Sequence, residues 1–271
     1  MLLAIDIGNT QTVLGLFKGT QLRYTWRLDS GTARTSDEVK AIVTQLFFEA
    51  QKQEQVPFAI NQVVIASVVP ALTQIWAELA QNMSYLRGAR KPIIVDAAIM
   101  RRYSKGIANP AEIGADRIAN AVAAKALYGS PAIVVDFGTA TNIDIIDEQG
   151  YYIGGIISPG VQTSADALFK NAARLPTIDL ELPDKVLGTT TKTAVQSGLL
   201  CGEAAKIEAL IWALKQENTA LSQSEIPVIA TGGLASRILP VTTRITHHDP
   251  DLTLKGLYLI ALLQVRRHVH E

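Results

Sequence analysis

The stretch Leu2-Leu3-Ala4-Ile5-Asp6-Ile7-Gly8-Asn9-Thr10 decides the fold class, because an apolar run there ends in an acid and a tight polar turn. Two further runs rich in β-forming residues follow, Val13–Phe17 and Leu22–Trp26, and only Lys18-Gly19-Thr20 separates them. Runs of this length joined by short turns are typical of antiparallel hairpins. The N-terminal region is therefore predicted to be a three-stranded meander.

The same pattern returns about half a chain later as Asp136-Phe137-Gly138-Thr139-Ala140. An apolar run at 132–136 leads into this turn, and strand-like runs at 142–146 and 151–157 follow it. Repetition of a whole unit indicates a duplicated fold. We therefore predict an α/β protein of two similar domains, 1–129 and 130–271, each a mixed sheet with a meander and flanking helices. The alternative is two ordinary α/β halves whose Asp-x-Gly turns coincide by chance.

The other elements follow from apolar spacing and end signals. Helical spacing after Ser36 predicts a helix that Ser36 caps. The region 100–110, with its basic residues, glycine and proline, is predicted to be a loop, and His247-His248 is predicted to lie in a surface loop. The remaining predicted elements are strands at 63–67, 92–95 and 228–230, and helices at 70–81, 114–127, 161–171, 193–215 and 252–267.

Composition excludes several classes of protein. The chain has 25 basic and 25 acidic residues, whereas nucleic-acid and anionic-membrane binding usually show a basic excess. The longest apolar stretch, 257–265, is too short to cross a bilayer, and the first residues lack the basic region of a signal peptide. The lone Cys201 favours a reducing, cytoplasmic location. Zero net charge leaves self-association unopposed by long-range repulsion.

Two acids stand where a buried strand meets a glycine turn. Asp6 precedes Gly8, and Asp136 precedes Gly138. A carboxylate there suits Mg²⁺, and glycine lets backbone N–H groups approach a phosphate. Taken alone, the Asp6 turn is better explained as an Asx-type turn that closes a hairpin, and the structural alternative at Asp136 is a β-turn. Their joint occurrence in a pseudo-symmetric chain favours a cleft between two domains that holds one phosphate chain from both sides.

A third acid lies at a predicted helix start, in Gly114-Ala115-Asp116-Arg117. An acid in the first turn stabilises a helix, which is the purely structural interpretation. Arg117 is unfavourable at that end of the helix dipole, so another role is indicated for the pair. We predict that Asp116 has a lowered pKa, stays ionised and accepts a proton from a substrate hydroxyl during phosphoryl transfer. Arg117 would pair with a substrate carboxylate or steady Asp116.

Two segments leave both interpretations open. Thr231-Gly232-Gly233 suits either close approach to a nucleotide or an ordinary turn between a strand and a helix. Thr189-Thr190-Thr191 suits either a helix cap or a contact with a polar ligand.

These motifs, taken in order, resemble the type III pantothenate kinases of the actin-like ATPase superfamily, which also includes acetate and sugar kinases. The most specific match is Pro110-Ala111-Glu112-Ile113-Gly114-Ala115-Asp116-Arg117. The other matching segments are Asp6–Thr10, Trp26-Arg27, 34–38, 67–70, Asp136–Thr141, Gly154-Gly155, Pro159-Gly160, 196–198 and Thr231–Gly233. The resemblance runs nearly end to end. It implies two ribonuclease H-like domains and ATP-dependent phosphorylation of pantothenate, the first step toward coenzyme A.

The resemblance also implies roles for individual residues. Asp116 is implied as the catalytic base, and Asp136 as a ligand of a monovalent cation, K⁺ or NH₄⁺. Mg²⁺ would enter with ATP and be held directly or indirectly by Asp6. The implied pantothenate-binding residues are Gly114, Ala115, Asp116, Arg117 and Thr191. The implied ATP-binding residues are Asp6, Ile7, Gly8, Asn9, Thr10, Gln11, Thr12, Val13 and Thr139.

The family is dimeric, so a homodimer with no nucleic-acid or membrane partner is expected. One departure from the family pattern concerns the substrate pocket, where Ile107 stands in a position that commonly holds tyrosine. Two alternatives stay open at this point. One is a related enzyme, either a kinase for another small hydroxyl compound or a phosphohydrolase, and the other is a non-enzymatic regulator.

Overall fold

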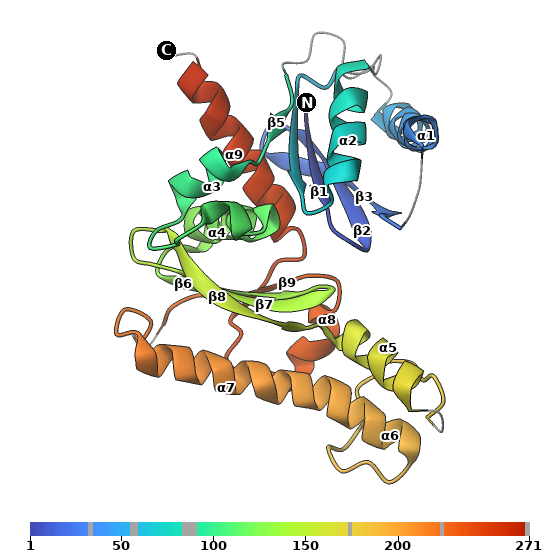
Figure 1. The fold of residues 1–271 in the computed structure, drawn as a ribbon, viewed down its shortest axis with the longest axis vertical. Helices are drawn as coiled ribbons and strands as arrows, with labels where there is room; N and C mark the ends of the chain where they lie inside the picture. The colour runs from blue at the N-terminus through green and yellow to red at the C-terminus, as the bar shows by residue number, and fades with distance from the viewer. Residues whose placement is uncertain (32–34, 55–58, 83–90, 173–174, 223–224, 269–271) are drawn as a thin grey trace. The chain divides into compact units, whose positions relative to one another are not determined.

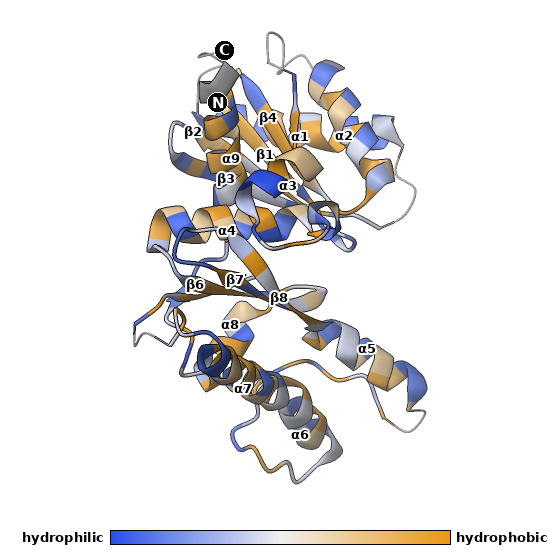
Figure 2. Ribbon diagram, turned by 60° about the vertical axis from the view of Figure 1, so that its left-hand side comes forward, coloured by the Kyte–Doolittle hydropathy of each residue, from blue (hydrophilic) through white to orange (hydrophobic). Residues whose placement is uncertain are grey.

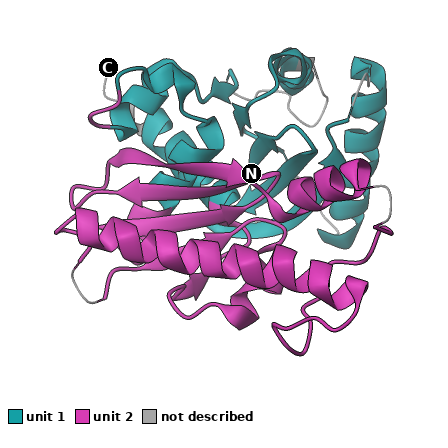
Figure 3. Ribbon diagram, turned by 60° about the horizontal axis from the view of Figure 1, so that its bottom comes forward, with its two compact units in different colours: residues 1–104, 108–123, 253–271 teal, residues 105–107, 124–252 magenta. Residues whose placement is uncertain are grey.

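The computed structural model describes residues 1–31, 35–54, 59–82, 91–172, 175–222 and 225–268 (Figure 1). The chain forms two compact units (Figure 3). The first unit comprises residues 1–104, 108–123 and 253–271, and the second comprises 105–107 and 124–252. The compactness of the units does not test whether they arose by duplication of one ancestral domain. The predicted domains 1–129 and 130–271 therefore stay a prediction.

The first unit contains a five-stranded mixed sheet in the order β3-β2-β1-β4-β5. Strand β1 pairs antiparallel with β2 and parallel with β4, so the predicted meander is confirmed and extended on its other side. The strands are β1 (Leu2–Ile7), β2 (Gln11–Lys18), β3 (Gln21–Asp29), β4 (Gln62–Ser67) and β5 (Ile93–Ile94).

Helices α1 (Ser36–Glu54) and α2 (Pro70–Asn82) supply the apolar partners of this sheet. Their side chains Val43, Phe47 and Trp76 lie in one cluster with Ile5 and Ile65. Figure 2 shows the apolar colour along β1 and β4. The prediction that Ser36 caps α1 is wrong by one residue. The Thr35 side chain accepts from the Glu38 N–H, and Glu38 accepts from the Thr35 N–H, which is a capping box.

Helix α9 (Leu252–His268) packs with the first unit although it ends the chain. Phe17 stacks on Tyr258 with ring centroids 4.6 Å apart, and a Cβ on Gly15 would lie 2.9 Å from the Leu254 side chain. Gly256 faces the backbone of Ala119 so closely that any side chain there would collide with the Ala119 carbonyl oxygen. The glycines therefore let α9 approach both the sheet and the helix that contains Ala119.

The predicted loop at 100–110 is only partly a loop. It includes the end of helix α3 (Ala97–Tyr103) and the start of the short 3₁₀-helix η2 (Pro110–Glu112). The Asp96 side chain accepts from the Ile99 N–H and starts α3, which buries Ile99 and Met100. Two of the basic residues that suggested a loop, Arg101 and Arg102, lie in the last turn of α3, where they are favourable to the helix dipole.

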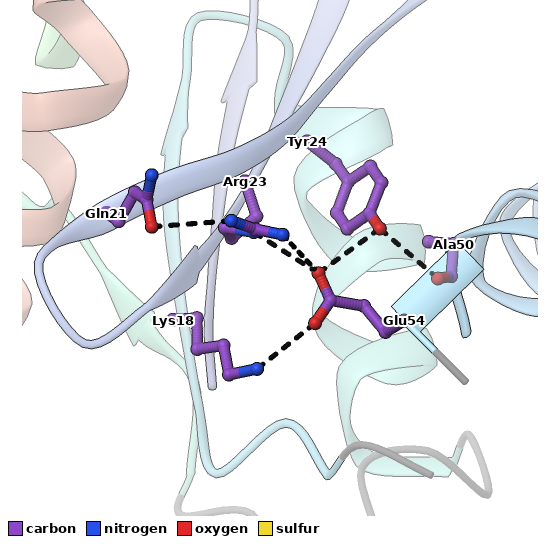
Figure 4. Close-up of polar contacts among 6 residues, drawn as sticks. All are labelled: Lys18, Gln21, Arg23, Tyr24, Ala50 and Glu54. Carbon is purple, nitrogen blue, oxygen red and sulfur yellow. Dashed lines mark hydrogen bonds and ion pairs between the residues drawn. The ribbon is translucent and has the colours of Figure 1, made fainter. Parts of the chain in front are cut away.

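The Glu54 carboxylate at the end of α1 ties that helix to the β2–β3 hairpin (Figure 4). It accepts from Lys18 Nζ at 3.1 Å, Arg23 Nη2 at 2.8 Å and Tyr24 Oη at 3.3 Å. The bonds from Lys18 and Arg23 lower the pKa of Glu54, whereas burial and the neighbouring carboxylate raise the pKa of Tyr24. The end of the hairpin remote from Gly8 is thereby fixed.

The second unit repeats the topology of the first, with a sheet in the order β10-β9-β6-β7-β8. Strand β6 pairs antiparallel with β7 and parallel with β9, as β1 does with β2 and β4. His247-His248, predicted to be loop, forms the edge strand β10 because its backbone pairs with Ile229 and Ala230. The strands are β6 (Ala132–Phe137), β7 (Ala140–Ile146), β8 (Tyr152–Pro159), β9 (Val228–Thr231) and β10 (His247–His248).

One long helical segment covers the core face of this sheet. It consists of α6 (Thr191–Gln196), a π-helical turn η3 (Ser197–Cys201) and α7 (Gly202–Glu217), so the predicted helix at 193–215 is confirmed. Its residues Leu200, Ile207 and Ile211 are fully buried. The remaining helices are α4 (Ala115–Tyr128), which runs from the first unit into the second, α5 (Val161–Asn171), α8 (Ala235–Ile238) and η4 (Leu239–Val241).

Candidate active site

The first glycine turn joins β1 to β2. Asp6 is the second-to-last residue of β1 and lies opposite Val13 in the ladder. The turn closes through the Gly8 N–H, which donates to the Gln11 carbonyl at 3.0 Å. Asn9 and Thr10 at its tip are exposed to solvent, so their polar groups are accessible to a ligand.

Strand β3 supports this turn from one side. Ser30 donates its N–H to the Thr10 carbonyl at 2.9 Å, and its hydroxyl lies 2.8 Å from the Thr12 hydroxyl. Ser30 is absent from the predicted site. Nothing in the sequence distinguishes it from an ordinary loop serine, since the contact depends on the pairing of β2 with β3.

The second glycine turn joins β6 to β7 and occupies the same place in its sheet. Asp136 is the second-to-last residue of β6 and lies opposite Asn142 and Thr231. The Gly138 N–H donates to the Ala140 carbonyl at 3.0 Å, which makes this turn one residue shorter than the first. The two predicted phosphate turns therefore occur at equivalent positions of two sheets with the same topology.

Two glycines pack directly on the second turn. A Cβ on Gly160 would collide with the Gly138 carbonyl oxygen, and one on Gly232 would lie 2.5 Å from Asp136 Oδ1. Gly232 also has φ +90°, a conformation that favours glycine. Gly232 therefore lies against Asp136 near the end of β6, and both interpretations of Thr231-Gly232-Gly233 stay open.

The carbonyl of Thr139 is held by the start of α5. It accepts from the Gly160 N–H at 3.0 Å and from the Thr163 hydroxyl at 2.7 Å. Thr163 and Gly160 were not predicted to belong to the site. A Pro-Gly pair between a strand and a helix is the signal that points to Gly160, whereas Thr163 has none.

Asp116 lies in the first turn of α4. Its Oδ1 accepts the Arg117 N–H at 2.9 Å, and a Cβ on Gly114 would collide with this same oxygen. Gly114 thus leaves room for the carboxylate at the helix start. The Arg117 side chain is buried, at 8% exposure, and follows directly in the helix.

The predicted lowering of the Asp116 pKa is wrong in direction. Burial raises the pKa of this carboxyl, and the N–H and guanidinium of Arg117 only partly offset the effect. The sequence showed the helix dipole and the neighbouring cation but not the depth of burial, and desolvation dominates here. A raised pKa suits a general base, because proton affinity increases with pKa.

Thr191 is the first residue of α6 and is exposed. Thr190 before it forms a capping box with Thr193, so the threonine run includes a helix cap. Asp6 and Asp116 belong to the first unit, and Asp136, Thr139 and Thr191 belong to the second. The substrate contact predicted for Thr191 stays a prediction.

A groove of about 580 Å³ lies in the second unit. Gln162 near the start of α5 and Ser236 near the start of α8 line it, together with Phe169, Asp179 and Arg237. Arg237 donates to the Leu180 carbonyl at 3.0 Å, which fixes its guanidinium at the groove. The volume is within the range of small-molecule sites, and both lining helices begin next to the second turn.

The oxygen atoms at Asp136 are ligands of the kind that hard cations prefer. Among the residues that the structure describes, no group of three or more histidine, cysteine or acidic side chains could hold a metal ion. Asp136 contributes one carboxylate beside the turn at Gly138–Thr139, and oxygen ligands of this kind suit hard cations.

Over the same described ranges, no helix is long and apolar enough to cross a membrane.

Two solved structures share the fold along nearly the whole chain. One is described as a Baf family transcriptional activator from Campylobacter jejuni, with TM-score 0.57, 19% identity and coverage of 97% of this chain and 99% of that one. The other, with bound ADPNP, is the activator of the 2-hydroxyisocaproyl-CoA dehydratase from Clostridium difficile, with TM-score 0.52, 14% identity and coverage of 99% and 97%. The two repeated sheets and their paired turns define an actin-like ATPase fold.

Sequence comparison narrows this class to one family. The family model of type III pantothenate kinases matches residues 2–213. The type III pantothenate kinase of Moorella thermoacetica is 42% identical over 260 residues, which cover 96% of this chain and 98% of that protein. The chain belongs to the type III pantothenate kinase family. Its reaction is the ATP-dependent phosphorylation of pantothenate, the first step of coenzyme A biosynthesis.

Proposed function

We propose that the reaction uses Asp116 as the general base toward the pantothenate hydroxyl, with Gly114, Ala115, Arg117 and Thr191 as pantothenate contacts. The turn segment Asp6–Val13 and Thr139 bind the ATP phosphates. The observation that carries this assignment is the pair of Asp-x-Gly turns at equivalent positions of two equivalent sheets. The raised pKa of the Asp116 carboxyl supports its role as the base.

We further propose that Mg²⁺ enters with ATP near Asp6 and that Asp136 holds K⁺ or NH₄⁺. A carboxylate beside a polyanionic nucleotide repels it unless a cation intervenes. The expected result is that product formation by the unmodified enzyme rises with added K⁺ and stops when Mg²⁺ is chelated. Asp136→Asn should reduce the rate at saturating K⁺ to the potassium-free level.

The experiment is a titration of product formation with K⁺ at fixed ionic strength, with choline as the replacement ion. Asp184→Asn is the matched control, because Asp184 is an exposed acid of the same unit. Activation by K⁺ that persists in Asp136→Asn would show that the cation site lies elsewhere.

We propose that the enzyme is a homodimer formed through the α6–α7 segment. The outer face of α7 presents Ala205, Ala209 and Trp212, and Trp212 is 54% exposed. Val186 and Leu187, just before α6, are 74% and 80% exposed. Small residues allow close approach, and exposed tryptophan in an apolar patch is typical of an interface.

We propose neither a nucleic-acid nor a membrane partner, and the cytoplasmic location stays a prediction.

Trp212→Glu should convert the protein from a dimer of two 29.2 kDa chains to a monomer in sedimentation equilibrium. A glutamate in the interface core leaves a buried charge without a partner. Phe48→Glu is the control, because Phe48 is 53% exposed on α1 of the other unit. A dimer that survives Trp212→Glu would exclude this face.

A further inference from the structure

An ion pair lies on the side of α7 that faces the sheet. Lys206 Nζ is 2.6 Å from Glu203 Oε2, and the two side chains are 34% and 7% exposed. The neighbouring Ala204, Ile207 and Ile211 belong to the apolar core. A partly buried ion pair adds little stability over apolar residues of similar size, because desolvation offsets the attraction. A role other than stabilising the helix is therefore indicated.

Lys206 also reaches the edge of the sheet. Its ammonium donates to the Ser158 hydroxyl at 2.9 Å, and that hydroxyl donates to the Thr141 carbonyl at 3.3 Å. Ser158 and Thr141 are direct partners in the β7–β8 ladder. Strand β8 lies at the edge of the sheet opposite β10, and among the described strands it pairs with β7 alone. The bond from Lys206 thus holds an edge strand from the helical layer.

The held strand ends against the second turn. Pro159 follows Ser158 and, having no N–H, removes a donor from the ladder opposite Ala140. The next residue, Gly160, donates to the Thr139 carbonyl. The Ser158 hydroxyl bond to Thr141 therefore reinforces the pairing of β7 and β8 beside the position where the ladder lacks a donor.

We infer that Lys206 and Ser158 are positioning residues for the phosphate turn at Gly138–Thr139. Lys206 orients the Ser158 hydroxyl, Ser158 holds the end of β8, and the end of β8 holds the Thr139 carbonyl through Gly160. Neither side chain needs to contact ATP for this role. The inference rests on the proposed assignment of Thr139 to the ATP phosphates.

Ser158→Ala and Lys206→Met test this role by steady-state kinetics. Each should raise the KM for ATP about tenfold, and kcat and the KM for pantothenate should stay within about twofold. Ser158→Thr keeps the hydroxyl and Lys206→Arg keeps a cationic donor, so both should retain a KM for ATP near that of the unmodified enzyme. Lys40→Met is the control, because Lys40 is an exposed lysine on α1 of the other unit.

An unchanged KM for ATP in both Ser158→Ala and Lys206→Met would overturn the inference. A lower kcat, higher KM values for both substrates and a lowered Tm in the same variant would also overturn it, because together they indicate a structural role. Lys206→Met leaves the Glu203 carboxylate buried without its cation. If Lys206→Met fails to fold, the double variant Glu203→Gln with Lys206→Met takes its place in the test.

Thr139→Val, measured in parallel, separates this inference from the site assignment. A raised KM for ATP in Thr139→Val with an unchanged value in Ser158→Ala overturns the positioning role alone. Unchanged values in both variants overturn the assignment of the Thr139 hydroxyl to ATP as well.

Discussion

Asp116→Asn is expected to reduce turnover by at least about 10³-fold while the protein stays folded. The asparagine side chain keeps the size of the carboxylate and can still accept the Arg117 N–H, but it cannot take a proton from the pantothenate hydroxyl. The measurement is the rate of phosphopantothenate formation at saturating ATP and pantothenate. Glu112→Gln is the matched control, because Glu112 is an exposed acid four residues earlier.

The same variant should melt at an equal or higher temperature than the unmodified enzyme at pH 8. Burial raises the pKa of Asp116 in the folded protein above its unfolded value, so the folded state binds the proton more tightly. The contribution of this carboxyl to stability is therefore present at low pH and is lost as the pH rises through its folded pKa. Asparagine carries no charge and avoids that loss. Lost activity together with a lowered Tm would indicate a structural role instead.

The raised pKa also determines the acid limb of the pH–rate profile. The base must be ionised, so kcat/KM should fall as the pH falls through the pKa of Asp116, above the range of an ordinary aspartate near pH 4. An acid limb at the ordinary position would argue against Asp116 as the titrating base.

Gly232→Ala is expected to destabilise the protein by about 3 kcal/mol and to raise the KM for ATP. An alanine there has a strained φ of +90° and a Cβ only 2.5 Å from Asp136 Oδ1 and 2.6 Å from the Phe137 carbonyl carbon. Either the second turn or the start of α8 must move. Denaturant unfolding and ATP-dependent kinetics measure the two effects.

Gly233→Ala is the control for this substitution. A Cβ on Gly233 meets no atom within 4 Å, and its φ is not in the left-handed region. Its stability and KM for ATP should stay close to those of the unmodified enzyme. Equal behaviour of the two alanine variants would show that close packing on Asp136 is unimportant.

Much of the fold could be predicted because the local signals agree with the tertiary structure. The predicted helix at 161–171 matches α5, and the strands that flank the two turns are found within one or two residues. Errors arose where tertiary contacts decide. His247-His248 has no strand pattern and is a strand only because β9 pairs with it.

The site was predictable to the extent that its chemistry is local in sequence. Asp6, Asp136 and Asp116 each stand beside a glycine that marks a turn or a helix start. The pKa of Asp116 depends on burial, which one sequence does not show. Gly160 and Thr163 contact the second turn from the start of α5, and Lys206 contacts Ser158 at the end of β8, so only the folded chain brings these residues together.

The most direct test of the proposed chemistry is one mass measurement. The unmodified enzyme and Asp116→Asn are each incubated with ATP, Mg²⁺, K⁺ and pantothenate, and phosphopantothenate is quantified by mass spectrometry. The expected result is abundant product with the unmodified enzyme and almost none with Asp116→Asn. Product formed by Asp116→Asn at a near-normal rate would contradict the assignment of Asp116 as the base.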